Sequence, residues 1–417
     1  MGVKTRKLGN ANNSIVEWQS VVVADGSTGL TAVAGRGYFI NTTGGAITVT
    51  LPTPKVGDVI RLKDYARTWH TNNVNIASAL LDGATTTTAF STQGQTVSLV
   101  YMDGTKGWSI INEDTSSKLE VPPAFTAATG GTVTTSGDFK IHSFTGDGNF
   151  VTNTLGNSPV SATGGPTQVS YVVVAGGGGA GVDRGGGGGA GGFREGRVSS
   201  PEYTASPLAT TGLTIAASTT YPITVGGGGA GGVHPGPSQP SGVSGSPSVF
   251  STITSTGGGG GKNANTGSAF PGGSGAGSAG SGPATAGTGN TPPVSPPQGN
   301  PGGDASDTTG PRGAGGGGAG AAAVPAGPTP GVAPGGGAGV TSHITGSPVA
   351  RAGGGAGTGS PNYQNSGGSG GGGNSSHAGA GSSGTANTGG GGGASNGPGG
   401  NAGAGGKGIV IIRYKFQ

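Results

Sequence analysis

Apolar and polar positions alternate in several short segments of the first 112 residues, which is the pattern of strands with one buried face. The alternation covers residues 46–51, 56–62, 73–76, 96–101 and 108–111, with Gly, Pro and Asp between them. No segment of useful length has the apolar period of a helix. Short strands separated by turn residues in this way predict a small β-sandwich or barrel.

A second apolar pattern brackets the rest of the chain. Residues 169–175 and 408–414 are continuous β-branched runs, as expected for strands that are buried on both faces. Two further strand-like stretches, 211–225 and 249–254, lie between them. These four stretches predict an ordered unit that is closed by strands at both ends.

Residues 118–169 predict a linker followed by a β-hairpin. Two adjacent prolines in the sequence Glu-Val-Pro-Pro at 120–123 favour a stiff, extended connection. Two strand-like stretches, 139–144 and 149–152, flank a Thr-Gly-Asp-Gly turn. The apolar side chains of this hairpin do not fall cleanly on one face.

Glycine dominates the composition, with 101 Gly and 28 Pro among 417 residues, whereas only 9% of residues are charged and 5% aromatic. So few large side chains cannot fill the core of one α/β enzyme over the full length. Five consecutive glycines at 257–261 break the period of collagen. The charge is also too low for an ordinary solvated, disordered tail.

The Gly-rich part allows two interpretations, a flexible linker or an ordered bundle. Polyproline II helices have three residues per turn and no internal hydrogen bonds. Without Cβ atoms, neighbouring helices can approach closely enough to hydrogen-bond through their backbones. We favour the bundle because apolar strands close both ends. The irregular spacing of the recurrent Gly-Gly-Gly-Ala-Gly sequence argues against a solenoid of fixed period; it starts at residues 177, 187, 227, 316, 335 and 353.

The predicted fold is therefore mainly β, with a small N-terminal β-sandwich or barrel-like domain and a Gly-rich domain of polyglycine II helices framed by short strands. We place four segments along the chain. Residues 1–20 form an attachment segment, 21–117 the β-domain, 118–169 the linker and hairpin, and 170–417 the Gly-rich domain.

Catalytic, metal and cofactor motifs are absent or unconvincing in the sequence. There is no Cys, and the five histidines lack ligand spacing. The Gly-x-Gly-x-x-Gly of residues 176–181 follows a strand, but the glycines after it cannot form the helix that a dinucleotide site needs. Glu195 and Glu202, the only glutamates after residue 120, lie in low-complexity sequence. We expect them in turns or in solvent, so we expect neither an enzyme nor a bound cofactor or metal.

The charge distribution bears on the partners. The net charge of +4 is thinly spread, and no cluster of Lys and Arg in the Gly-rich part predicts nucleic-acid binding. No apolar run approaches 18 residues, and residues 1–10 lack an apolar signal core. We therefore expect synthesis in a cytoplasm and no membrane insertion.

The end and the opening of the Gly-rich part, and a β-module in the first domain, have distinctive sequences. The stretches are 171–181, 185–193, 384–390 and 408–414 in the Gly-rich part, and 37–52, Gly57-Asp58, Asp64-Tyr65 and 71–73 in the first domain. On these stretches, both parts of the chain resemble segments of virion appendage proteins, including tail fibres, from tailed marine bacteriophages.

The resemblance implies a homotrimeric tail fibre or adhesin on the virion surface, which binds a bacterial polysaccharide or outer-membrane protein through loops at one tip. Other virion proteins of the tail, baseplate or capsid would bind the N-terminus. Ile15, Val16 and Trp18 are the apolar residues that we expect to anchor it. A second interpretation of Trp18, as the start of the β-domain, stays open.

Aromatic residues between Gly runs are the candidates for receptor contact. Phe193, Phe270 and Tyr363 lie there and can either cap the bundle ends or bind the receptor. His343 is a weaker candidate, as is His234. The alternatives to an adhesin are a capsid head fibre or decoration protein, a tail-borne polysaccharide depolymerase, and an ice-binding protein.

Overall fold

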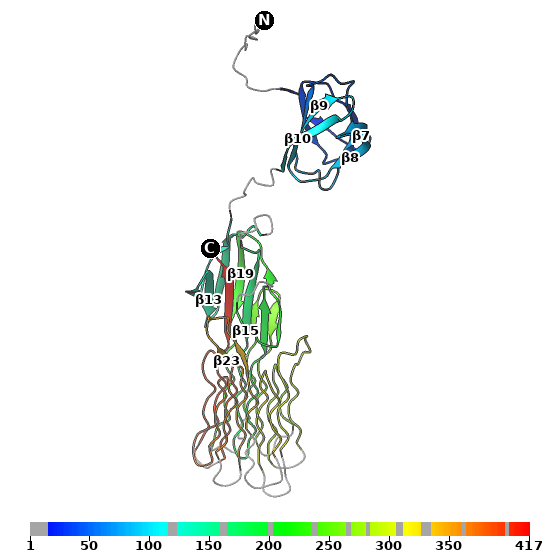
Figure 1. Ribbon diagram of the computed structural model, residues 1–417. Helices are drawn as coiled ribbons and strands as arrows, with labels where there is room; N and C mark the ends of the chain where they lie inside the picture. The colour runs from blue at the N-terminus through cyan, green and yellow to red at the C-terminus, as the bar shows by residue number, and fades with distance from the viewer. Residues whose placement is uncertain are drawn as a thin grey trace, which may run out of the picture. The chain divides into compact units, whose positions relative to one another are not determined.

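A computed structural model describes residues 16–115, 123–158, 165–198, 203–234, 241–263, 268–280, 284–305, 312–326, 335–359, 364–396 and 400–417 (Figure 1). The chain divides into two compact units between Val121 and Pro122. All regular secondary structure in the ranges given is β-strand, which confirms the predicted mainly β class.

The N-terminal unit is a single ten-stranded sheet with the order β1-β4-β6-β9-β10-β7-β5-β3, in which β2 also pairs with β4 and β8 with β7. All five predicted strands are present, and β1 to β4 and β8 are additional. The strands are β1 (Glu17–Trp18), β2 (Val22–Val23), β3 (Gly29–Thr31), β4 (Arg36–Asn41), β5 (Ile47–Thr50), β6 (Val59–Asp64), β7 (Val74–Leu81), β8 (Ala84–Phe90), β9 (Gln95–Asp103) and β10 (Gly107–Thr115).

Strands β2 to β7 alternate between two halves of the sheet. The even-numbered strands β2, β4 and β6 pair in parallel, as do β3, β5 and β7. The antiparallel pair β9–β10 joins the two halves. Inward side chains of both halves, such as Ile60 and Val74, form one core with Trp69 and Trp108. The two halves of the sheet therefore pack face to face as a β-sandwich, although strands β9 and β10 connect them into one sheet.

Polar residues in the first-domain stretches that carry the phage resemblance hold loops in place. The buried Asp64 carboxylate accepts hydrogen bonds from the backbone N–H groups of Thr68 (3.1 Å), Trp69 (3.3 Å) and Gly94 (2.8 Å). The Asn72 side-chain amide donates to the Thr42 carbonyl over 2.9 Å. These residues have a structural role, because they satisfy backbone groups that turn away from the sheet.

The second unit contains two larger sheets and a two-stranded one. The five-stranded sheet has the order β11-β14-β19-β20-β21, the seven-stranded sheet the order β12-β13-β24-β15-β16-β17 with β18 on β15, and β22 pairs with β23. The strands are β11 (Ala127–Thr129), β12 (Thr132–Ser136), β13 (Phe139–Phe144), β14 (Gly148–Thr154), β15 (Gln168–Val174), β16 (Phe193–Arg197), β17 (Ala209–Thr211), β18 (Leu213–Thr214), β19 (Thr219–Thr224), β20 (Ser248–Phe250), β21 (Ile253–Ser255), β22 (Val340–Ser342), β23 (Val349–Arg351) and β24 (Ile409–Lys415).

The two continuous β-branched runs are the central strands β15 and β24, which pair antiparallel. On one face, Val173 and Ile412 pack against Phe150 and Phe250 of the five-stranded sheet. On the other face, further residues of both strands pack in a second core with Phe193. The expectation that these strands are buried on both faces is confirmed.

The predicted hairpin at 139–152 is wrong. Strand β13 pairs with β12 and β24, whereas β14 pairs with β11 and β19 in the other sheet. Phe144 and Phe150 both reach the core between the two sheets, so the chain crosses from one sheet to the other at this turn. These strands belong to the Gly-rich unit and are not a separate linker.

Beyond the sheets, the Gly-rich segments run back and forth as extended chains (Figure 1). The N–H groups of residues 176–178 donate to three neighbouring segments in turn, and those of residues 179–181 donate to the same three segments in the same order. The hydrogen-bond pattern therefore has a period of three residues. The acceptors are, in order, the carbonyls of Ser246, Gly406, Gly189, Val243, Gly403 and Gly186. A three-residue period is that of the polyproline II helix.

The carbonyls of the same segment show the same period toward three other neighbours. Their donors are, in order, the N–H groups of Gly258, Gly229, Gly392, Gly261, Gly232 and Ser395. The segment is therefore surrounded by six others, and each of its polar backbone groups in this range is satisfied. Residues 186–191 donate with the same period of three.

The absence of side chains makes this packing possible. A Cβ atom at Gly178 would meet the carbonyl oxygens of Gly259 and Gly258 well inside van der Waals contact. Alanine occurs where neighbours leave room, as in the small cluster of Ala180, Ala394 and Val182. Backbone-to-backbone contact thus replaces a side-chain core in this part of the unit.

We expect Gly178→Ala to lower the free energy of unfolding of the Gly-rich unit by about 1–3 kcal/mol, the usual cost of overpacking. Gly227→Ala is the matched control, because Gly227 is exposed and an added Cβ would meet no atom within 4 Å. It should be neutral or stabilise by about 0.4–1 kcal/mol through the unfolded state. Calorimetry of the full chain measures both, and equal effects would contradict the packing argument.

Stability of the Gly-rich unit should also depend on pH through His142. This ring is buried between the Gly130 carbonyl (Nδ1, 2.7 Å) and the Tyr414 hydroxyl (Nε2, 3.0 Å). Burial lowers the pKa of His142 in the folded state, so protonation favours unfolding. The stabilisation is complete above the unfolded pKa of about 6.5 and declines below it, by at most about 1.4 kcal/mol per pH unit.

Thermal unfolding of the full chain between pH 7.5 and 5.5 tests this dependence. His142→Gln should flatten the decline, whereas His343→Gln, at a partly exposed position, should leave it intact. A decline that persists unchanged in His142→Gln would assign the effect to another group.

Candidate functional site

The Gly-rich segments leave the sheets and return to them, so one end of the bundle lies far from the strands (Figure 1). We call it the distal end and define it by residues 182–185, 233–234, 262–263, 312–313 and 395–396. The Gly186 N–H donates to the Lys262 carbonyl and the Gly280 N–H to the Arg184 carbonyl. Such hydrogen bonds hold these segments at the same height along the bundle. Segments reverse direction there, at the end of the bundle away from the strands.

A two-residue turn at the distal end is fixed by its neighbours. Asp183 and Arg184 have positive φ angles of 50° and 59°, a conformation that residues with side chains adopt at some energetic cost. The Arg184 N–H donates to the Asn396 side-chain oxygen over 3.0 Å. The Arg184 side chain is exposed, so a rigid turn presents a cation to solvent.

Phe270 lies along the bundle between the strands and the distal end, with its N–H donating to the Gly260 carbonyl over 3.3 Å. Its side chain is 39% exposed, and the Lys262 Nζ lies 3.9 Å from the centre of its ring. Such a cation–π contact contributes about 0.5–1 kcal/mol at an exposed site. The sequence analysis missed Lys262, although an isolated cation eight residues before an isolated aromatic was a usable signal.

The other receptor-contact candidates do not join Phe270. The structure corrects the expectation that Phe193 can contact a receptor. Phe193 begins β16, is 1% exposed and packs in a core of the seven-stranded sheet. His343 follows β22 at the sheet end, where its N–H donates to the Thr204 carbonyl over 3.0 Å. Partly exposed His234 does lie at the distal end, and its N–H donates to the Asn401 side chain. Tyr363 lies outside the described residues.

Glu195 also differs from expectation, because it is buried in β16 and not in a solvated turn. Its carboxylate accepts hydrogen bonds from the Ser206 N–H (2.9 Å) and the Ser342 hydroxyl (2.6 Å). Burial lowers the pKa of Arg351, and the charge of Glu195 opposes that shift. Both carboxylate oxygens thus hold neighbouring chain segments. Glu202 lies outside the described ranges.

The N-terminal candidates belong to the β-domain. Val16 is buried, and Trp18 lies in β1, which pairs with β4. The Trp18 ring stacks on Phe39 with 4.5 Å between ring centres and remains 36% exposed. This favours the second interpretation of Trp18, and the domain includes residues 16–20. Ile15 precedes the described part of the chain.

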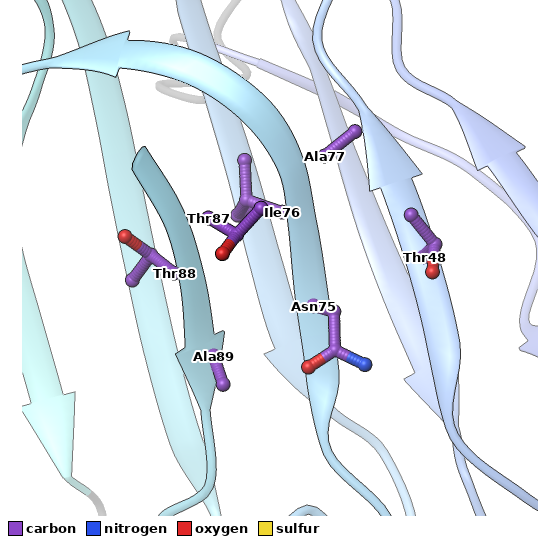
Figure 2. Close-up of a pocket in the computed structure, with 7 residues that line it drawn as sticks. All are labelled: Thr48, Asn75, Ile76, Ala77, Thr87, Thr88 and Ala89. Carbon is purple, nitrogen blue, oxygen red and sulfur yellow. The ribbon is translucent and has the colours of Figure 1, made fainter. Parts of the chain in front are cut away.

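A groove of about 300 Å³ lies on the outer face of β5, β7 and β8 (Figure 2). Its lining consists of hydroxyl, amide and small apolar side chains: Thr48, Asn75, Ile76, Ala77, Thr87, Thr88 and Ala89. These groups can form hydrogen bonds and van der Waals contacts, but none can act as a general acid or base near neutral pH.

Within the ranges that the structure covers, no group of three His, Cys, Asp or Glu side chains could hold a metal ion. Among the same residues, no helix has the length and apolarity to cross a membrane.

Two comparisons with known proteins give matches. The family model described as a glycine-rich domain matches residues 151–415. A stretch of 74 residues is 38% identical to the baseplate wedge protein gp10 of Enterobacteria phage T4. This similarity covers 17% of the present chain and 12% of that relative.

Proposed function

Because the chain belongs to the glycine-rich domain family, we propose that it is a structural virion protein of a tailed bacteriophage. We further propose that it is a tail fibre or adhesin, which attaches the particle to the host by non-covalent binding. The observation that carries this proposal is the bundle itself, a hydrogen-bonded scaffold whose segments reverse direction at one end.

The similarity to a baseplate wedge protein supports a place in the phage particle. It covers a small part of that protein, so its specific role in the baseplate is not carried over. The resemblance of the first domain and of the Gly-rich part to phage appendage proteins supports the same placement. It is also the ground on which we propose a homotrimer.

The hydrogen-bond period supports the interpretation of the Gly-rich segments as polyglycine II helices. In such a bundle, the positions of the chain reversals depend on backbone contacts. Loops at the distal end can therefore vary without loss of the scaffold. Phe270, Lys262 and Arg184 are the residues of the described part that we propose as contacts with a bacterial polysaccharide or outer-membrane protein. Exposed aromatic and Arg side chains are common anchors of binding sites.

We propose binding without catalysis. A glycosidase needs two carboxyl groups on either side of a bound sugar. Glu195 is buried with both oxygens hydrogen-bonded, which counts against its use in a depolymerase. The N-terminal unit, in this proposal, contacts other virion proteins.

Antibodies against residues 170–417 should label purified virions, and electron microscopy should place the label at the baseplate or at fibre tips. Label over the capsid would instead make the protein a head fibre or decoration protein. Unlabelled virions, with the purified chain labelled as a control, would contradict the virion assignment.

Phe270→Ala should reduce binding of the purified full chain to host cells by about 10-fold or more, the effect expected of an anchor worth roughly 1.4–2 kcal/mol. Val133→Ala is the control, because Val133 is also exposed but lies on β12 at the sheet end. Binding is measured with labelled protein and cells, and thermal unfolding verifies that both variants fold. Equal binding by the two variants would remove Phe270 from the contact surface.

A further inference from the structure

The N-terminal unit has an open edge at its first coil, which we define as residues 16–33. Strand β2 pairs with β4 and β3 pairs with β5, and the structure gives neither strand a second partner among the described residues. The two strands belong to opposite halves of the sheet. Among the described residues, both halves therefore end in strands that are paired on one edge only, β1 and β2 in one half and β3 in the other.

The register identifies the backbone groups that face outward from this edge. Ala24 donates to the Asn41 carbonyl (2.8 Å) and Ala32 to the Thr50 carbonyl (2.9 Å), so these residues point toward their paired strands. Because alternate residues of a strand point to opposite edges, the N–H and C=O groups of Val23, Gly29 and Thr31 face the open side. All three residues are exposed.

Apolar side chains cluster on this first coil. Trp18, Val21, Val23 and Val33 are among the exposed large hydrophobic residues of the chain, and Val23 is 64% exposed. Natural proteins protect free edges with Lys, Pro or bulges. The first coil contains no Lys, Arg or Pro, so its combination of unpaired backbone and exposed apolar side chains is suited to being covered.

The outer edge of β8 is the other strand edge to compare. β8 pairs with β7, and none of its residues is among the exposed large hydrophobics. Its sequence, Ala-Thr-Thr-Thr-Thr-Ala-Phe, gives a polar edge. The first coil is therefore the better candidate for a protein partner.

We propose that the open edge of the first coil binds an extended strand of another virion protein by β-strand addition. Glu17 and Asp25 are exposed, and the first coil carries no positive side chain to balance them. The strand that fits has apolar side chains flanked by Lys or Arg. A second copy fits less well, because its own acidic edge would face this one. This inference rests on the proposed function and specifies the surface that joins the protein to the particle.

Two matched variants test the edge during phage assembly. Val23→Lys places a positive charge on the proposed surface, whereas Val56→Lys makes the same change at a 76% exposed position outside the first coil. We expect copies of Val23→Lys per purified particle to fall at least 10-fold, as measured by quantitative immunoblot. Val56→Lys should be incorporated like the unchanged protein, and both isolated variants should unfold at the same temperature.

Normal incorporation of Val23→Lys would overturn the edge proposal and leave the proposed function in place. Absence of the unchanged protein from particles would overturn both. Hydrogen exchange provides a second readout at Val23, Gly29 and Thr31. We expect fast exchange of their amides in the isolated full chain and at least 10-fold slower exchange in particles. Protection already present in the isolated chain would show that the edge is covered by residues 1–15 or by a second copy, and would also overturn the proposal.

Discussion

Direct hydrogen bonding between neighbouring backbones is the interaction on which the Gly-rich unit depends. Each bond contributes little in net free energy, on the order of 0.5–1.5 kcal/mol, and ordering glycine costs more backbone entropy than ordering other residues. The bundle compensates through the number of bonds. A central segment forms hydrogen bonds with six neighbours, so the loss of one hydrogen bond leaves most of its bonds in place.

The same constraint decides where side chains can lie. A Cβ atom inside the bundle would collide with a neighbouring carbonyl at positions such as Gly178, so large and charged groups collect near the ends. Glu195 and Arg351 lie at the sheet end, where hydrogen bonds and opposite charge accompany their burial. Arg184 and Lys262 lie at the distal end. Charged side chains are thereby kept out of the interior of the bundle.

The N-terminal unit is stabilised by a different kind of interaction. Its stability comes from a conventional side-chain core around Trp69 and Trp108, and its loops are held by polar groups such as Asp64. Parallel strands that alternate between two sheet halves have no natural end, because each coil leaves an edge for the next one. The consequence is the open outer edge of the first coil, with its exposed Val23.

The sequence by itself determined the strand class, the five strands recognised in the N-terminal unit and the burial of β15 and β24, because these depend on local periodicity and β-branched composition. Only the tertiary structure decided which strands pair. Phe144 and Phe150 lie in one local pattern but in different sheets. Phe193 and Phe270 both lie between Gly runs, yet the first begins a strand and is buried, while the second is 39% exposed. The exposure of each ring depends on where its segment lies in the bundle. That position is determined by contacts between residues far apart in the chain.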